Sequence, residues 1–353
     1  MQRQRLLVTG HHGYIGAVLV KMLCKAGHDV VGLDADFFAQ NRFVGDIANI
    51  PGLQRDLRDV ELGDLQGFDA VLHLAALSND PLGDLNPGLT YEINHRASMR
   101  LANLARQAGV TRFLFSSSCS MYGAAGSEML DESAPFNPVT PYADSKVLVE
   151  RELGTLANSD FSPVFLRNTT AYGVSPFMRF DVVLNNLVAW ASTTGRVKIQ
   201  SDGTPWRPLV HVEDICRAFI AVLDAPREVI HNQAFNVGTT EENYQVRDLA
   251  EIVKSTVPGC TLEYAEHGGP DPRSYRVNFS KIKNSLPAFR PQWNVRRGAQ
   301  ELYAACREAQ LKVEDFEGRR FKRIAHIRNL VAEGKLDSQL RWSHLGAAVA
   351  PVS

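Results

Sequence analysis

Cysteine is scarce in this chain of 353 residues, and the five cysteines that occur have no CxxC spacing. Because they are scattered and odd in number, we expect neither a disulfide framework nor a metal site, and they fit a reducing compartment. A net charge of −1 gives no electrostatic reason to expect nucleic acid or an anionic membrane as partner. Apolar runs are only strand-sized, and a strand begins at once where a signal peptide would lie. We therefore expect a cytoplasmic protein without a membrane span.

Short apolar strands alternate with amphipathic helices over the N-terminal half. Strands are expected at 5–10, 28–34, 69–76, 112–118 and 162–169, and helices at 16–27, 89–109 and 143–157. This alternation predicts an α/β fold with a Rossmann-type, doubly wound parallel sheet. The length of the chain allows one such core with a smaller α/β lobe attached.

Three glycines stand directly after the first expected strand, in the stretch VTGHHGYIG at 8–16. Gly10, Gly13 and Gly16 would let the backbone turn tightly and bring a pyrophosphate to the N-terminus of the next helix. Asp34 ends the second expected strand, where a carboxylate can accept hydrogen bonds from a ribose diol and repel a 2′-phosphate. The plainer alternatives are that the glycines form an ordinary turn and that Asp34 only caps a turn. Together, the two features predict a site for NAD rather than NADP.

Further residues are expected around the same dinucleotide. The stretch VGDIAN is placed to hold the adenine, although an ordinary loop acid is nearly as good an interpretation of its aspartate. The stretch LHLAA at 72–76 supplies small residues where backbone must approach the cofactor. The cofactor residues predicted in addition to the glycines and Asp34 are Tyr14, Ile15, Asp46, Ile47, Leu74, Ala75 and Ala76.

A tyrosine and a lysine stand four residues apart in the stretch TPYADSK. Thr140 as N-cap and Pro141 at the first helical position would start a helix just before Tyr142, so Tyr142 and Lys146 would share one helix face. A nearby ammonium favours phenolate and lowers the pKa of the tyrosine, which could then act as a general base. Such a pair occurs by chance in many helices, but here it follows the glycine turn and the serine-rich strand FLFSSS.

These motifs resemble those of the extended short-chain dehydrogenase/reductase family, which contains nucleotide-sugar epimerases and dehydratases, and the layout is closest to the UDP-galactose 4-epimerases. The stretches that carry the resemblance are TGHHGYIG, DI at 46–47, HLAA, SSSCSMYG, YADSK, LRNTTAYG, RPLVHVEDI and DPRSYRVNFSKI. The resemblance implies that Tyr142 takes a proton from a sugar hydroxyl while hydride passes to tightly held NAD. It also implies that Ser118 hydrogen-bonds the same oxygen and that Lys146, besides assisting Tyr142, binds the nicotinamide ribose.

The two residues after Ser118 distinguish reactions within the family. In the dehydratases they are an acidic pair, whereas here they are Cys119 and Ser120, and neither is a carboxylic acid. We therefore expect an epimerase that inverts carbon 4 through a keto sugar, with Cys119 filling space. A ketosugar reductase or sugar dehydrogenase of the same fold is the main alternative. A non-catalytic NAD-binding sensor is the alternative from another class.

The resemblance also places a nucleotide-sugar substrate. Guanidinium groups suit a diphosphate, because they can bind phosphate in a bidentate manner. The residues predicted to contact substrate are Ser118, Cys119, Ser120, Thr170, Arg179, Asn185 (or its neighbour Asn186), Arg207 and Arg273. Family members pair through two helices, so we expect a homodimer whose seam could be filled by Leu101, Leu104, Leu148 and Leu153.

Two lobes are expected from these assignments. Residues 1–173 would form the NAD-binding Rossmann domain, with 208–235 returning to it. Residues 174–207 and 236–353 would form the substrate-binding lobe and a C-terminal tail that is basic and partly helical.

Overall fold

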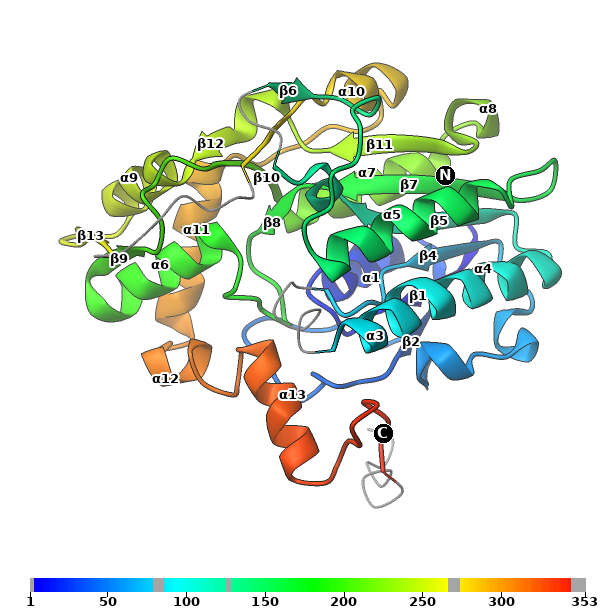
Figure 1. Cartoon of the computed structure of the whole chain (residues 1–353), viewed down its shortest axis with the longest axis horizontal. Helices are drawn as coiled ribbons and strands as arrows, with labels where there is room; N and C mark the ends of the chain where they lie inside the picture. Colours follow the sequence, from blue (N-terminus) through cyan, green and yellow to red (C-terminus); the bar gives the residue numbers. More distant parts are fainter. Residues whose placement is uncertain (1–2, 79–85, 125–127, 266–273, 344–353) are drawn as a thin grey trace.

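A parallel sheet forms the centre of the protein, which the computed structural model describes for residues 3–78, 86–124, 128–265 and 274–343. Among these residues the sheet has seven strands in the order β3-β2-β1-β4-β5-β7-β11 (Figure 1). Their bounds are β1 Arg5–Thr9, β2 Asp29–Asp34, β3 Gly52–Gln54, β4 Ala70–His73, β5 Arg112–Ser118, β7 Ser162–Asn168 and β11 Gln233–Val237. The predicted Rossmann-type fold is confirmed.

The chain reverses its direction of progress across the sheet at β1. Strands β2 and β3 follow on one side of β1, whereas β4, β5, β7 and β11 follow on the other. In a doubly wound sheet, such a reversal leaves a crevice at the carboxyl ends of the two central strands, and ligands bind there. The glycine turn follows β1 and the serine-rich stretch ends β5, so both motifs reach this edge of the sheet.

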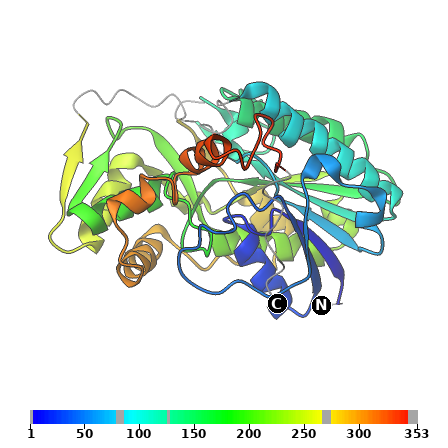
Figure 2. The same ribbon diagram turned by 90° about the horizontal axis from the view of Figure 1, so that it is seen from below.

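Helices cover both faces of the sheet (Figure 2). One face carries α1 (Gly16–Lys25) and α7 (Val212–Asp224), which share a core with β1 and its neighbours. The opposite face carries α3 (Pro87–Thr90), the π-helical segment η3 (Tyr91–Ala97), α4 (Ser98–Gln107) and α5 (Pro141–Gly154). Because helices bury both faces, the central strands are apolar over most of their length, and polar residues gather at their ends.

A smaller lobe has a core of its own, formed by α6 (Val183–Thr194), α9 (Val246–Thr256) and α11 (Val295–Glu308). Its short strands and those beside it are β6 Met129–Leu130, β8 Thr170–Tyr172, β9 Arg196–Ile199, β10 Trp206–His211, β12 Asn243–Gln245, β13 Thr261–Tyr264 and β14 Arg276–Val277. Strand β10 was expected to return to the large sheet, but it pairs with β8 and β12. The strand that joins the large sheet is β11. Helix α7, which lies between β10 and β11 in the sequence, packs on a face of that sheet.

The C-terminal tail runs from the smaller lobe back to the large sheet (Figure 1, orange to red). Helix α12 (Val313–Phe316) packs beside α6, and α13 (Arg323–Ala332) packs on the loop after β2. The remaining short helices are η1 Leu57–Asp59, η2 Leu62–Leu65, η4 Cys119–Tyr122, α8 Arg227–Ile230, η5 Thr240–Glu242 and α10 Ser280–Ser285. No helix within the described ranges is long and apolar enough to cross a membrane.

Two of the four leucines proposed for a dimer seam cannot serve there. Leu101 and Leu153 are fully buried against the sheet of their own chain. Helical periodicity marked them as apolar, but it does not say which partner covers them. Leu104 and Leu148 keep partial exposure and remain candidates for the seam.

Candidate active site

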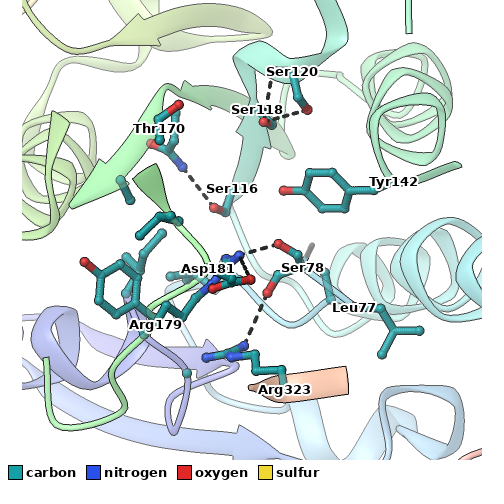
Figure 3. Close-up of a pocket in the computed structure, with 18 of the residues that line it drawn as sticks. Leu77, Ser78, Ser116, Ser118, Ser120, Tyr142, Thr170, Arg179, Asp181 and Arg323 are labelled. Carbon is teal, nitrogen blue, oxygen red and sulfur yellow. Dashed lines mark hydrogen bonds and ion pairs between the residues drawn. The ribbon is translucent and has the colours of Figure 1, made fainter. Parts of the chain in front are cut away.

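A cavity of about 720 Å³ opens at the carboxyl edge of the large sheet, where the strand order reverses. The glycine turn, the ends of β2, β4 and β5, and the first turn of α5 form one side, while β8, α6 and β10 form the other. Figure 3 shows the side chains of both sides pointing into the same space. The cavity therefore lies between the two lobes.

The glycine turn has the geometry expected for an anion site. Gly10 has a φ of +75°, and a Cβ there would lie 2.8 Å from the backbone nitrogen of Ala75. A Cβ on Gly16 would collide with the carbonyl oxygen of Gly10, so only glycine allows this close turn. Helix α1 then begins without a side-chain cap and without an acidic residue in its first turn. Its free N–H groups and dipole suit a phosphate.

Asp34 lies at the end of β2 and lines the cavity, as predicted. Its two carboxylate oxygens accept hydrogen bonds from the backbone nitrogens of Asp36 (2.9 Å) and His12 (3.0 Å). These bonds hold the carboxylate in place and leave further lone pairs for a ribose diol. The other cavity-lining residues predicted for the cofactor are Tyr14, Ile15, Leu74, Ala75 and Ala76.

Asp46 and Ile47, which were predicted to hold the adenine, do not line this cavity. They lie in the irregular segment before β3, and Asp46 is exposed. Strand β3 follows them and places Asp56 and Leu57 at the cavity instead. The sequence contains a similar Asp-Leu pair at 56–57. Strand β3, which places this pair at the cavity, has only three residues and is too short to be predicted from the sequence pattern.

Helix α5 begins as predicted, with Pro141 in its first turn and the Thr140 hydroxyl accepting a hydrogen bond from the backbone nitrogen of Ala143 (3.2 Å). Tyr142 and Lys146 therefore both line the cavity. The Lys146 ammonium donates a hydrogen bond to the carbonyl oxygen of Ser116 (2.8 Å). Burial lowers the pKa of Lys146 to about 7, although Glu150 opposes this.

Ser118 and Ser120 meet at the end of β5. The Ser118 hydroxyl accepts a hydrogen bond from the backbone nitrogen of Ser120 (3.1 Å) and donates one to its hydroxyl (2.9 Å). In Figure 3 both hydroxyls lie on the side of the cavity that faces Tyr142. Two hydroxyls are thus available beside the tyrosine to bind a substrate oxygen.

Cys119 does not contact this cavity, so its predicted place among the substrate residues is wrong. Its side chain is fully buried, and its thiol donates to the carbonyl oxygen of Arg167 (3.1 Å). Burial raises the pKa of the thiol well above its usual value. The short helix η4 turns the side chain of Cys119 inward and that of Ser120 outward, which the sequence alone did not indicate.

A buried ion pair contacts the serine-rich strand β5. Glu150 of α5 and Arg167 of β7 lie 2.7 Å apart, and both side chains are less than a tenth exposed. The Ser117 hydroxyl donates to Glu150, and Arg167 donates to the hydroxyl of Tyr122 (3.0 Å). This network joins α5, which carries Tyr142 and Lys146, to the strands that carry the serines.

The residues predicted for the substrate separate into two groups. Thr170, Arg179 and Arg207 line the cavity. Asn185 does not: it is fully buried, donating to the Tyr14 hydroxyl (3.0 Å) and to the Arg179 carbonyl oxygen (2.8 Å). Its neighbour Asn186 lines the cavity in its place. Arg273 lies outside the described residues.

Several cavity residues were not predicted. Asn168, at the end of β7, is buried with an amide oxygen that has no hydrogen-bond partner within the described structure. Its amide nitrogen donates to the Ser116 hydroxyl (3.0 Å). Arg323 enters the cavity from α13 of the C-terminal tail and donates to the Ser78 hydroxyl (3.3 Å). A residue so far along the chain carries no local motif that points to the site.

The sequence profile of the NAD dependent epimerase/dehydratase family matches residues 6–238. A UDP-glucose 4-epimerase of Lactobacillus helveticus is 28% identical over 307 residues, which cover 80% of this chain and 91% of that protein. UDP-glucuronic acid decarboxylase 1 of Arabidopsis thaliana is 25% identical and covers 90% of this chain and 73% of its own. The structure of MoeE5 in complex with UDP-glucuronic acid and NAD superposes with a TM-score of 0.74, at 28% identity over 86% of this chain and 99% of that one.

The residues of the cavity fit NAD. The uncapped N-terminus of α1 can receive the pyrophosphate, Asp34 can accept from a ribose diol, and Tyr142 and Lys146 line the same cavity. With the family match, the similarity to NAD-dependent relatives and this fit, the chain belongs to the NAD-dependent epimerase/dehydratase family, and it is an NAD-dependent enzyme.

Proposed function

We propose that this enzyme inverts carbon 4 of a nucleotide sugar through a transient 4-keto sugar. One arrangement carries the proposal: Tyr142 and Ser118 line one cavity, whereas Cys119 is turned into the core. Elimination of water needs acid and base groups at the carbons beside the keto group. The position after Ser118 offers no such group to the cavity, and Ser120 offers only a hydroxyl.

The chain's own residues would handle the proton. Tyr142 as phenolate takes the proton of the sugar hydroxyl, and Ser118 hydrogen-bonds the same oxygen as it becomes a carbonyl. The Lys146 ammonium, 5.7 Å from the centre of the Tyr142 ring, favours the phenolate. Bound NAD supplies a hydride acceptor and donor. Inversion requires the keto sugar to turn over before Tyr142 returns the proton, and small side chains such as Ser120 leave room for that.

A uridine diphosphate sugar is the substrate class that we propose. Proteins similar to this chain are named for UDP-glucose or bind UDP-glucuronic acid. Arg207 of β10 lines the lobe side of the cavity together with Thr170. A guanidinium at that side suits the diphosphate of such a sugar.

Nuclear magnetic resonance in deuterated water tests the proposed reaction. The enzyme would be incubated separately with UDP-glucose, UDP-galactose and UDP-glucuronic acid. We expect a carbon-4 epimer that contains no solvent deuterium, because the hydrogen of carbon 4 is removed and returned as hydride. Deuterium at carbon 3 or 5, a 4-keto-6-deoxy sugar, or loss of carbon dioxide from the glucuronic acid would replace this assignment with another reaction of the family.

We also propose that the enzyme is a cytoplasmic homodimer. Leu104 of α4 and Leu148 of α5 are partly exposed on adjoining helices of one sheet face, where a second copy could bury them. Light scattering at micromolar concentration should return twice the mass of the chain, and a monomer mass would contradict the proposal.

A further inference from the structure

The C-terminal tail packs over the part of the cavity nearest Asp34. Its apolar side chains form one cluster with residues that follow β2 and β4 and with residues of α3 and η3. The members of this cluster are Phe37, Phe38, Leu77, Leu89, Ile93, Ile324, Ile327, Leu330, Leu336, Leu340 and Trp342. Burial of these side chains stabilises the tail in one position beside the cofactor end of the cavity.

Polar contacts bind the tail to the loop that follows Asp34. The Trp342 indole donates to the carbonyl oxygen of Ala35 (2.6 Å). His326 of α13 hydrogen-bonds the carbonyl oxygen of Phe37 (2.8 Å), and Arg341 forms an ion pair with Asp59. All three contacts reach residues that follow β2 or β3, at the side of the cavity that the ribose-binding carboxylate Asp34 marks.

Arg323 stands in the first turn of α13 and is the tail's charged residue in the cavity. Its guanidinium donates to the Ser78 hydroxyl and lies 4.6 Å from the centre of the Phe38 ring. No carboxylate of the described residues forms an ion pair with Arg323, whereas Arg179 beside it pairs with Asp181 at 2.8 Å. Burial and the charge of Arg179 lower the pKa of Arg323 to about 10. A partly buried cation in this position would be stabilised by an anionic ligand.

The position of Arg323 indicates which anionic ligand it would bind. Its guanidinium contacts Phe38, which follows Asp34 in the loop after β2, and Ser78, which follows β4. The carboxylates of Asp181 and Asp34 both attract its charge. Figure 3 places Arg323 beside Ser78 and away from Ser118 and Thr170. We propose that Arg323 binds the pyrophosphate of NAD, so that residues 313–342 form a strap that closes over the bound cofactor. The inference rests on the NAD dependence of the family and not on the proposed carbon-4 reaction.

The strap has a consequence for cofactor exchange. NAD could leave only after the apolar cluster around Trp342 has opened, so dissociation should be slow. A cofactor that is oxidised and reduced again within one turnover does not need to leave. The strap therefore suits an enzyme that keeps its NAD through many cycles.

Calorimetry on nucleotide-free protein tests the role of Arg323. Loss of a charge-assisted hydrogen bond in the Arg323→Gln variant should weaken NAD binding roughly 10- to 100-fold. ADP-ribose, which retains the pyrophosphate but lacks nicotinamide, should lose the same factor, and UDP should bind as in wild type. Arg328→Gln is the matched control, because Arg328 is exposed on the same helix. Unchanged NAD affinity, or an equal loss for UDP, would overturn the proposal.

A second measurement uses the wild-type protein and so does not depend on how the variant folds. Trypsin should cleave the strap within 319–335, which is rich in lysine and arginine. Saturating ADP-ribose should slow this cleavage at least roughly tenfold, because bound ligand stabilises the closed state by mass action. UDP should not slow it. Equal cleavage rates with and without ADP-ribose would show that the tail does not close on the cofactor.

Discussion

The ammonium of Lys146 lies 5.7 Å from the ring centre of Tyr142, one helical turn further along α5. At this distance the cation can stabilise a phenolate without a direct hydrogen bond. The ammonium also donates a hydrogen bond to the carbonyl oxygen of Ser116 (2.8 Å), which fixes its position. Helix α5 therefore sets the spacing of Tyr142 and Lys146, and strand β5 fixes the position of the ammonium.

Tyr142→Phe should lower turnover by roughly 100- to 10,000-fold, because it removes the group that we propose as the base. NAD affinity, measured by calorimetry, should remain close to that of wild type. Tyr91→Phe is a suitable control, since Tyr91 donates to Asp144 on the same sheet face but does not line the cavity. A Tyr142→Phe variant with more than about a tenth of the wild-type rate would require another base.

Lys146→Met should stabilise the NAD-free protein while abolishing activity. Burial holds the pKa of Lys146 at about 7 in the folded protein, below its ordinary value of 10.5. The unfolded chain therefore binds more protons between these two values, and the penalty of burying the charge is complete below pH 7 and fades toward pH 10. In urea denaturation, the gain in the free energy of unfolding of the variant over wild type should be larger at pH 6 than at pH 9, by about 3 kcal/mol.

The exposed Lys21 of α1 provides the control for this experiment. Lys21→Met should leave the pH dependence of unfolding as it is in wild type. If the Lys146→Met advantage were the same at both pH values, the ammonium would not be held at a lowered pKa in the folded protein.

Asp34→Asn should narrow the preference for NAD over NADP by roughly tenfold, since the carboxylate no longer repels a 2′-phosphate. Asp46→Asn should leave both affinities unchanged, because Asp46 is exposed and does not line the cavity. Titration calorimetry with both dinucleotides measures the ratio. Equal affinities of wild type for NAD and NADP would remove the role that we assign to Asp34.

Glu150→Ala should lower the free energy of unfolding by about 3–5 kcal/mol, because it leaves the Arg167 guanidinium buried without its partner. Glu152→Ala on the same helix should cost less than about 1 kcal/mol, since the Glu152 side chain is half exposed. Urea denaturation of both variants decides the point. Equal losses would mean that the buried ion pair is not specifically required.

Cys119→Ala should retain most of the activity, because the thiol faces the core and hydrogen-bonds a backbone carbonyl oxygen. Filling space is then its role, and the variant should lose only about 1 kcal/mol of stability. A rate reduced by about 100-fold or more, with the stability of wild type, would instead make Cys119 an acid–base group.

Local chemistry allowed much of this enzyme to be predicted from its sequence. Gly10 and Gly16 indicate a turn that no larger residue can form, and Thr140 with Pro141 indicates where α5 begins. The register of that helix then places Tyr142 and Lys146 on one face. Such features depend on neighbours within a few residues, so they can be recognised before the fold is known.

Other features depend on which distant segments meet, and only the tertiary structure decided them. Whether Asp46 or Asp56 reaches the cavity depends on β3, a strand of three residues that exists because β2 pairs with it. Helix η4 turns Cys119 inward, where its thiol hydrogen-bonds a carbonyl oxygen of β7. Asn185 does not reach the cavity because its side chain hydrogen-bonds Tyr14, a residue 171 positions earlier in the chain. Arg323 reaches the site because an apolar cluster stabilises the tail there, and burial between distant segments is non-directional and leaves no local motif.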